Sequence, residues 1–124
     1  MPSKRILLVD DSCTARLVHR MIFSQKTNYE LLSASDGREA LEKARAEKPD
    51  LIIMDIVMPR MTGLEACREL KADKGTDRIP VILLTTRGEE EYVQQGYASG
   101  CSDYLTKPVK DVELLDLLKA YLGE

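Results

Sequence analysis

The sequence lacks the features that mark several large classes of protein. No apolar stretch is long enough to cross a bilayer, and the first apolar run is too short for a signal peptide and passes directly into Asp10. There is no long run of like charges, no repeat and no low-complexity segment. The formal net charge is −3 and the pI is near 5.3, whereas nucleic-acid-binding surfaces are normally basic. We therefore expect a cytoplasmic protein that neither enters a membrane nor binds nucleic acid directly.

Cysteine and histidine are also scarce. The three cysteines, Cys13, Cys67 and Cys101, are an odd number without CxxC spacing, which favours reduced thiols over a metal or redox site. Cys67 shares a helical face with small and apolar residues, so we expect it in the core. The one histidine, His19, has no partner nearby in the sequence, and we expect it to be a solvent or packing residue rather than a phosphodonor.

Four short apolar runs are present, and each leads into residues that can take part in phosphoryl chemistry. Continuous apolar tetrads are typical of strands buried on both faces, as in a parallel sheet covered by helices. The carboxyl ends of such strands meet at one edge, where open α/β sheets bind their ligands. The runs are Ile6 to Val9 before Asp10 and Asp11, Leu51 to Met54 before Asp55, Val81 to Leu84 before Thr85, and Tyr104-Leu105 before Lys107.

Strand patterns alternate with helical periodicity five times along the chain. We expect a weaker edge strand at about Tyr29 to Ala34, a helix over Leu64 to Lys71, a poor helix over Glu89 to Ser99, and a last helix capped by Asp111. The pattern predicts one α/β domain over residues 1–124, a (βα)5 doubly wound parallel sheet of strand order 2-1-3-4-5, the flavodoxin-like topology. The chain stops soon after the last predicted helix, so we expect no effector domain.

Three carboxylates at the predicted edge, those of Asp10, Asp11 and Asp55, would repel one another. Two unit charges about 4 Å apart repel by roughly 4 kcal/mol at the dielectric usual near protein surfaces. Mg2+ prefers oxygen ligands and leaves room for a phosphate, and together with Lys107 it would balance the three charges. A carboxylate beside such a metal can attack phosphorus, and the hydroxyl of Thr85 can donate to a phosphoryl oxygen.

These residues and their spacing resemble those of a known protein family. The chain resembles, over essentially its whole length, the receiver domain of two-component response regulators of the stand-alone chemotaxis (CheY-like) type. The matching positions are Val9-Asp10-Asp11-Ser12, Met54-Asp55, Met58-Pro59, Gly63, Thr85-Thr86, Gly100, Asp103-Tyr104-Leu105 and Lys107-Pro108.

The resemblance implies the roles of the site residues. It implies that Asp55 is the phosphoacceptor and receives its phosphoryl group from a histidine kinase or a phosphotransfer protein. It implies that Asp11, Asp55 and the backbone carbonyl of Val57 bind Mg2+, with Asp10 acting through water. A protein of this kind catalyses only its own phosphotransfer and dephosphorylation and is otherwise no enzyme.

The resemblance also implies a conformational switch made of Thr85 and Tyr104. Thr85 would shift toward the phosphoryl group and Tyr104 would turn into the space it leaves, although simple half-buried packing remains the alternative role for Tyr104. The surface of the fourth helix, fifth strand and fifth helix would then change and bind a downstream protein, such as a motility component. We expect a monomer or a weak dimer.

In the family that the chain resembles, two positions flank the phosphoryl group and influence its hydrolysis, and this chain departs from the family pattern at both. Val57 lies two residues after Asp55 and cannot position an attacking water, and Arg87 lies two residues after Thr85 and could pair with the phosphate. We therefore expect a longer phosphoryl lifetime than in receivers with polar residues there.

Other functions stay open to different degrees. A phosphate sink or a relay intermediate without its own output needs the same residues. An aspartate-nucleophile phosphatase normally has a second carboxylate two residues after the nucleophile, where this chain has Val57. A flavin-binding module of this topology would need a phosphate-binding loop after the first strand, where Asp10 and Asp11 would repel phosphate.

Overall fold

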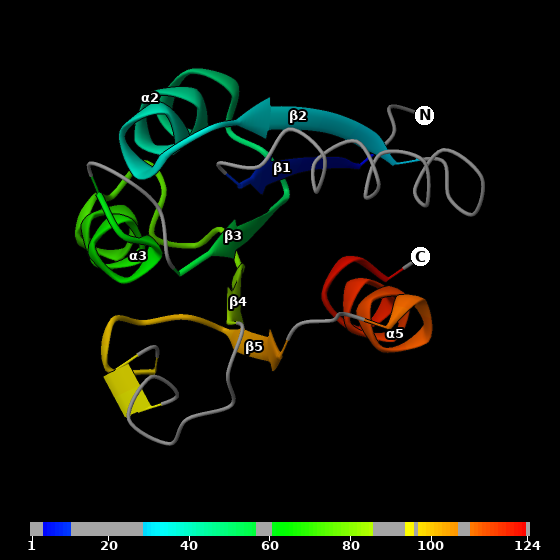
Figure 1. The fold of residues 1–124 in the computed structure, drawn as a ribbon. Coiled ribbons are helices and arrows are strands. Elements are labelled where there is room, and N and C mark those ends of the chain that lie inside the picture. The colour runs from blue at the N-terminus through cyan, green and yellow to red at the C-terminus, as the bar shows by residue number, and fades with distance from the viewer. Residues whose placement is uncertain are drawn as a thin grey trace.

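Short parallel strands form one sheet in the computed structural model (Figure 1). The structure describes residues 4–10, 29–56, 61–85, 94–95, 97–106 and 110–123, apart from the side chains of Thr85 and Asp111. The strands in these ranges are β1 (Arg5–Val9), β2 (Glu30–Ala34), β3 (Leu51–Asp55), β4 (Val81–Thr85) and β5 (Asp103–Thr106). Their order is β2-β1-β3-β4-β5 and every pairing is parallel, which confirms the predicted topology with β2 at an edge.

The apolar tetrads explain why β1, β3 and β4 form the middle of the sheet. Every residue in Ile6 to Val9, Leu51 to Met54 and Val81 to Leu84 is at most 2% exposed. Strands buried on both faces have this continuous apolar pattern because each face is covered by helices. The edge strand β2 begins with an exposed glutamate, Glu30, and its burial is less complete.

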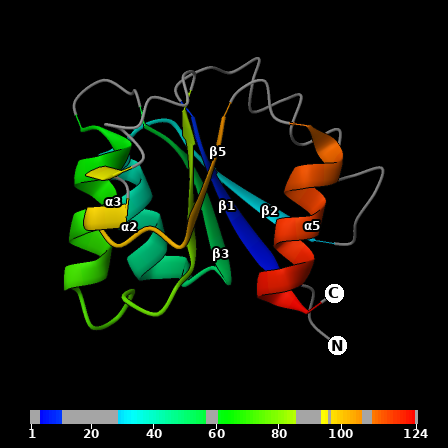
Figure 2. The same ribbon diagram turned by 90° about the horizontal axis from the view of Figure 1, so that it is seen from below.

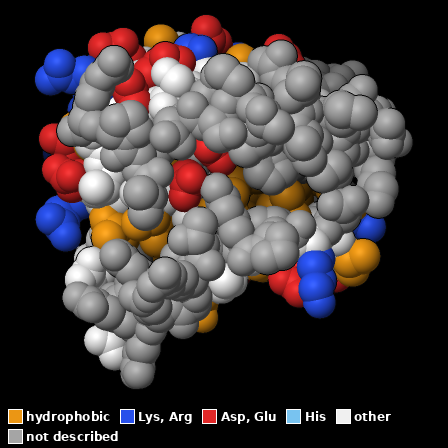
Figure 3. Space-filling model, viewed as in Figure 1, with side chains coloured by type: hydrophobic (Ala, Val, Ile, Leu, Met, Phe, Trp, Pro, Cys, Tyr) orange, Lys and Arg blue, Asp and Glu red, His pale blue; other side chains and the backbone are white. Residues whose placement is uncertain are grey.

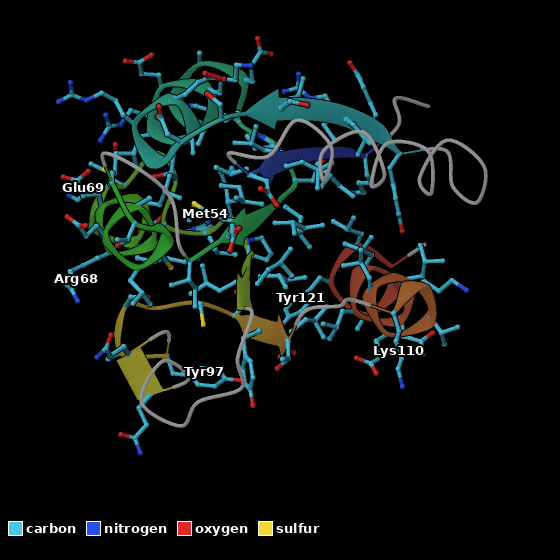
Figure 4. All side chains as sticks on the ribbon, in the orientation of Figure 1. Met54, Arg68, Glu69, Tyr97, Lys110 and Tyr121 are labelled. Carbon is cyan, nitrogen blue, oxygen red and sulfur yellow. The ribbon has the colours of Figure 1, made fainter. Side chains whose placement is uncertain are left out.

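Three helices cover the described part of the sheet. Figure 2 shows two of them on one face and the third on the other. Within α3, Cys67 and Leu70 are buried, as predicted for Cys67, whereas the exposed Arg68 and Glu69 point away from the sheet (Figure 4). The helices are α2 (Gly37–Glu47) and α3 (Gly63–Ala72) on the first face and α5 (Asp111–Leu122) on the second.

Side chains of each strand alternate between two apolar layers. Leu7 and Leu83 belong to the layer beneath α2 and α3, and Leu8 and Leu84 belong to the layer beneath α5. Residues in register on parallel neighbours point to the same face, so the two layers continue across the sheet. The carboxyl ends of the strands lie at the top of Figure 2. Polar residues follow the apolar runs at this edge.

The helix starts show one error in the sequence predictions. The side chain of Asp36 caps α2 by accepting a hydrogen bond from the backbone N–H of Glu39 at 2.9 Å. Asp111 was the predicted cap of α5, but the N-cap is Lys110, whose side chain makes no capping hydrogen bond, and Asp111 is the first helical residue. An acidic residue is favourable both at the cap and in the first turn, so the sequence pattern does not separate the two positions.

Two predicted helices fall wholly or largely outside the described residues. The helix that the alternating pattern predicts between β1 and β2 lies outside them, and the helix expected over Glu89 to Ser99 is described only at positions 94–95 and 97–98, which are helical, and at Ser99, which is in a turn. Among the helices that are described, none is long and apolar enough to span a bilayer.

Candidate functional site

Two buried carboxylates lie side by side at the carboxyl edge of the sheet. Val9 of β1 is in register with Met54 of β3, and the next residues after these two are Asp10 and Asp55. Neighbouring strands run about 4.8 Å apart, so these two positions are adjacent across the sheet. Asp10 is 4% exposed and Asp55 is 6% exposed. In the space-filling view of Figure 3, acidic side chains are visible near the middle of the molecule.

Backbone hydrogen bonds hold both carboxylate-bearing positions. The N–H of Asp10 donates to the carbonyl of Ala34 at 3.1 Å, and the N–H of Ile56 donates to the carbonyl of Leu84 at 3.0 Å. The ladder thus continues past the last apolar residue of each strand. Asp10 and Asp55 are therefore held in place by the hydrogen bonding of the sheet.

The first turn of α3 packs directly against the backbone of Asp55. The N–H of Gly63 donates to the carbonyl of Ile56 at 2.8 Å. A Cβ at Gly63 would lie 2.2 Å from the carbonyl oxygen of Asp55 and 2.9 Å from the Cα of Ile56, which is closer than any side chain allows. Gly63 is thus a positioning residue for Asp55. From the sequence, Gly63 is only one of the positions that match the receiver family, without this role.

A capping box fixes the start of the same helix. The hydroxyl of Thr62 accepts a hydrogen bond from the backbone N–H of Glu65, and the carboxylate of Glu65 accepts one from the backbone N–H of Thr62, both at 3.2 Å. This reciprocal pair satisfies two backbone donors at the helix start. The Thr-x-x-Glu spacing is readable in the sequence and is the signal that could have found it.

Of the other residues predicted at this edge, the structure describes only the backbone of Thr85. Asp55 is in register with Leu84, and Thr85, the next residue of β4, is in register with Thr106 of β5. Thr85 is described without its side chain, and Lys107 follows Thr106 just outside the described residues. Three further predicted residues also lie outside them, namely Asp11, Val57 and Arg87.

Tyr104 lies in β5, away from the carboxylate pair and toward the α3 side of the sheet. It is in register with Leu83, is half-buried, and packs on the apolar layer beneath α2 and α3. Its ring meets that of Tyr97 edge to face, with 5.8 Å between the ring centroids and 86° between the planes. Tyr97 was not among the predicted site residues.

The buried thiols contribute nothing to this site. Burial is the main reason why the pKa of Cys67 is raised, and it raises the pKa of Cys101 to about 11, so both stay protonated near neutral pH. Both are free thiols. In the parts of the chain that the structure covers, no group of three or more His, Cys, Asp or Glu could hold a metal ion.

The donors present at the edge suit a hard cation. Asp10 and Asp55 offer carboxylate oxygens from neighbouring strands, and burial of two such charges is unfavourable unless they are paired or hydrogen-bonded. No buried side-chain oxygen or nitrogen among the described residues lacks a hydrogen-bond partner. An oxygen-only donor set with one or two carboxylates fits Mg2+ better than it fits a softer metal.

Comparisons with known proteins agree on one family. The model of the response regulator receiver domain matches residues 6–119. Protein PilH of Pseudomonas aeruginosa is 42% identical over 119 residues, which span 96% of this chain and 98% of the relative.

Solved structures show the same likeness. The chemotaxis protein CheY4 of Vibrio cholerae has a TM-score of 0.89 and 35% identity, covering 97% of this chain and 99% of that one. The receiver domain of the sensor histidine kinase PA1611 from Pseudomonas aeruginosa has a TM-score of 0.90 and 30% identity, covering 99% and 100%, and it is described with a magnesium ion coordinated in its active-site cleft.

Proposed function

This chain belongs to the response regulator receiver domain family of two-component signalling, and from that premise we propose that Asp55 is the residue that accepts the phosphoryl group. Receiver domains act as phosphoacceptor switches. The observation that carries the assignment is the position of Asp55: a buried carboxylate at the carboxyl end of the central strand, beside Asp10 and backed by Gly63.

Phosphotransfer uses the carboxylate of Asp55 as nucleophile. Its oxygen attacks the phosphorus of a phosphohistidine, so that an O–P bond forms while the N–P bond breaks and the imidazole leaves with the electron pair. We propose that the ammonium of Lys107 and the hydroxyl of Thr85 stabilise the charge on the phosphoryl oxygens, since Thr85 is the last residue of β4 and Lys107 follows β5 in the sequence. The chain catalyses only this transfer and its own dephosphorylation.

The metal of this site is proposed to be Mg2+, which receiver domains bind in their active site. The residues that would hold it are Asp10, Asp11 and Asp55 with the backbone carbonyl of Val57, Asp10 acting through water. When bound, Mg2+ offsets the carboxylate charge and the charge of the incoming phosphoryl group. The oxygen-only character of Asp10 and Asp55 supports this choice.

The partners are proposed to be a histidine kinase or phosphotransfer protein upstream and a protein target downstream. Receiver domains interact with proteins of both kinds. The large hydrophobic side chains exposed in the described residues, Tyr97, Val112 and Tyr121, come from the segment before β5 and from α5, which supports docking of the target on the face of the fourth helix, β5 and α5. We propose a monomer or weak dimer that acts in the cytoplasm, without direct contact to membrane or nucleic acid.

The switch is proposed to consist of Thr85 and Tyr104. Tyr104 is in register with Leu83, two residues before Thr85 on the neighbouring strand, so a shift at Thr85 is close enough to alter the space around the Tyr104 ring. A role in chemotaxis or motility is the further proposal, supported by the description of the similar CheY4 as a chemotaxis protein.

One experiment tests the phosphoacceptor. The protein is incubated with Mg2+ and acetyl phosphate, and its mass and amide spectrum are followed. We expect the mass gain of one phosphoryl group in the wild type and in Asp116→Asn, a control that changes an exposed carboxylate of α5, but none in Asp55→Asn. A phosphoryl group that persists in Asp55→Asn would disprove the assignment.

The amide spectrum also decides between a switch and a sink. A switch changes the resonances of β5 and α5 upon phosphorylation, because the target surface rearranges. If only residues around Asp55 respond, the chain is a phosphate sink or relay intermediate without its own output.

A further inference from the structure

The aromatic contact between Tyr97 and Tyr104 links the proposed switch residue to the segment before β5. The rings meet at 86° with centroids 5.8 Å apart, within the range in which edge-to-face pairs attract. Tyr104 is half-buried on the apolar layer beneath α2 and α3, and Tyr97 is 49% exposed, so it covers the outer side of the Tyr104 ring. Figure 4 shows the labelled Tyr97 beside β5.

The backbone that carries Tyr97 is held by α3. The carbonyl of Tyr97 accepts a hydrogen bond from the N–H of Gly100 at 3.0 Å. Gly100 has a φ of 97°, and a Cβ there would lie 2.8 Å from the Cγ of Lys71 in α3. The buried Ser99 offers its carbonyl to the thiol of Cys67 in α3, at 3.7 Å. The segment of residues 97–100, which carries Tyr97, is therefore held against α3 through Ser99 and Gly100.

The chain that follows this segment is hydrogen-bonded to β4 just before β5 begins. The N–H of Ser102 donates to the carbonyl of Val81 at 2.8 Å, and the hydroxyl of Ser102 accepts from the N–H of Val81 at 3.2 Å. Rotation of the Tyr104 side chain breaks none of these bonds, because Tyr104 takes part in none of them. Tyr97 thus stays in place when the ring of Tyr104 leaves it.

We propose that Tyr97 is a positioning residue that holds the ring of Tyr104 in the arrangement seen here and so opposes the switch. This inference rests on the proposed function, because it assumes that phosphorylation at Asp55 turns Tyr104 away from Tyr97. A contact made in only one of two conformations shifts their equilibrium by its own free energy. Edge-to-face pairs of this kind correspond to a factor of roughly two to ten in that equilibrium.

The test is the affinity of the unphosphorylated protein for beryllofluoride, which stands in for the phosphoryl group on Asp55. Amide spectra in the presence of Mg2+ give the titration midpoint for the wild type and for Tyr97→Leu, Tyr97→Phe and Tyr29→Leu. We expect Tyr97→Leu to bind roughly two- to tenfold more tightly, because the resting arrangement has lost its support. Tyr97→Phe keeps the ring and should match the wild type.

The control variant removes a tyrosine ring elsewhere. Tyr29 precedes β2, at the far edge of the sheet from β5, and packs on the layer beneath α5, so Tyr29→Leu should leave the midpoint at its wild-type value. Thermal unfolding of each variant verifies that it folds, and Tyr97→Ile is the second variant if Tyr97→Leu does not.

Each result supports or overturns the proposal. An unchanged or weaker affinity in the folded leucine or isoleucine variant overturns it, and so does a phenylalanine variant that behaves like leucine, because the ring contact would then not be the cause. If the wild type itself does not bind beryllofluoride at Asp55, the proposed function fails, and that outcome is separate from a failure at Tyr97.

Discussion

Replacement of Gly63 by alanine should displace Asp55. The added Cβ would lie 2.2 Å from the carbonyl oxygen of Asp55, whereas ordinary contacts begin at 3.4 Å, so the helix start or the strand end must retreat by about 1.2 Å. That movement disrupts the hydrogen bond from the N–H of Gly63 to the carbonyl of Ile56. The effect is direct because the atoms that clash are backbone and cannot turn aside.

The magnitude follows from opposing contributions. Overpacking costs about 1–3 kcal/mol, and loss of one backbone hydrogen bond costs about 1 kcal/mol. Alanine in place of glycine raises the free energy of unfolding by about 1 kcal/mol, because it lowers the entropy of the unfolded chain and has a better helix propensity. We expect Gly63→Ala to lower the free energy of unfolding by about 1–3 kcal/mol. A misplacement of about 1 Å at the nucleophile can also slow phosphorylation by up to about a hundredfold.

Urea unfolding measures the first effect and the rate of phosphorylation by acetyl phosphate measures the second. Gly75→Ala is the matched control, because the nearest atom to a Cβ there is the carboxylate of Asp73 at 3.4 Å, an ordinary contact. The control should be as stable and as active as the wild type. If Gly63→Ala unfolds and reacts like Gly75→Ala, the close packing of α3 against Asp55 does not position the nucleophile.

Two further predictions rest on the local structure, and a third rests on the sequence. Thr62→Ala removes the capping box of α3 and should lower the free energy of unfolding by about 1 kcal/mol in urea, while Thr62→Ser should restore it. The pKa of Cys101 is raised from 9.0 to about 11, so its stabilising contribution is complete below pH 9 and is lost as the pH rises through about 11. Thermal unfolding of Cys101→Ala should accordingly show a smaller loss of stability over that interval, and an equal loss would contradict the assignment. Val57→Asn should speed autodephosphorylation by allowing a side chain to orient water; an unchanged rate in a phosphate-release assay would end that hypothesis.

The strands and their order could be predicted from the sequence. Apolar tetrads such as Ile6 to Val9, bounded by polar residues and alternating with helical patterns, are typical of strands buried on both faces of a helix-covered sheet, and the burial of these residues agrees with that interpretation. The convergence of Asp10 and Asp55 then follows from parallel direction and right-handed crossovers, without any contact being known. The prediction failed at Asp111, because a carboxylate is favourable at two adjacent positions of a helix start.

The sequence by itself determined the chemistry available at the carboxyl edge, because residue types and strand periodicity are local properties. Only the tertiary structure decided how that edge is supported. The approach of Gly63 to Asp55 and the contact of Tyr97 with Tyr104 depend on where α3 and the segment before β5 settle against the sheet. Such distances arise from packing between elements remote in sequence, and no periodicity in the chain encodes them.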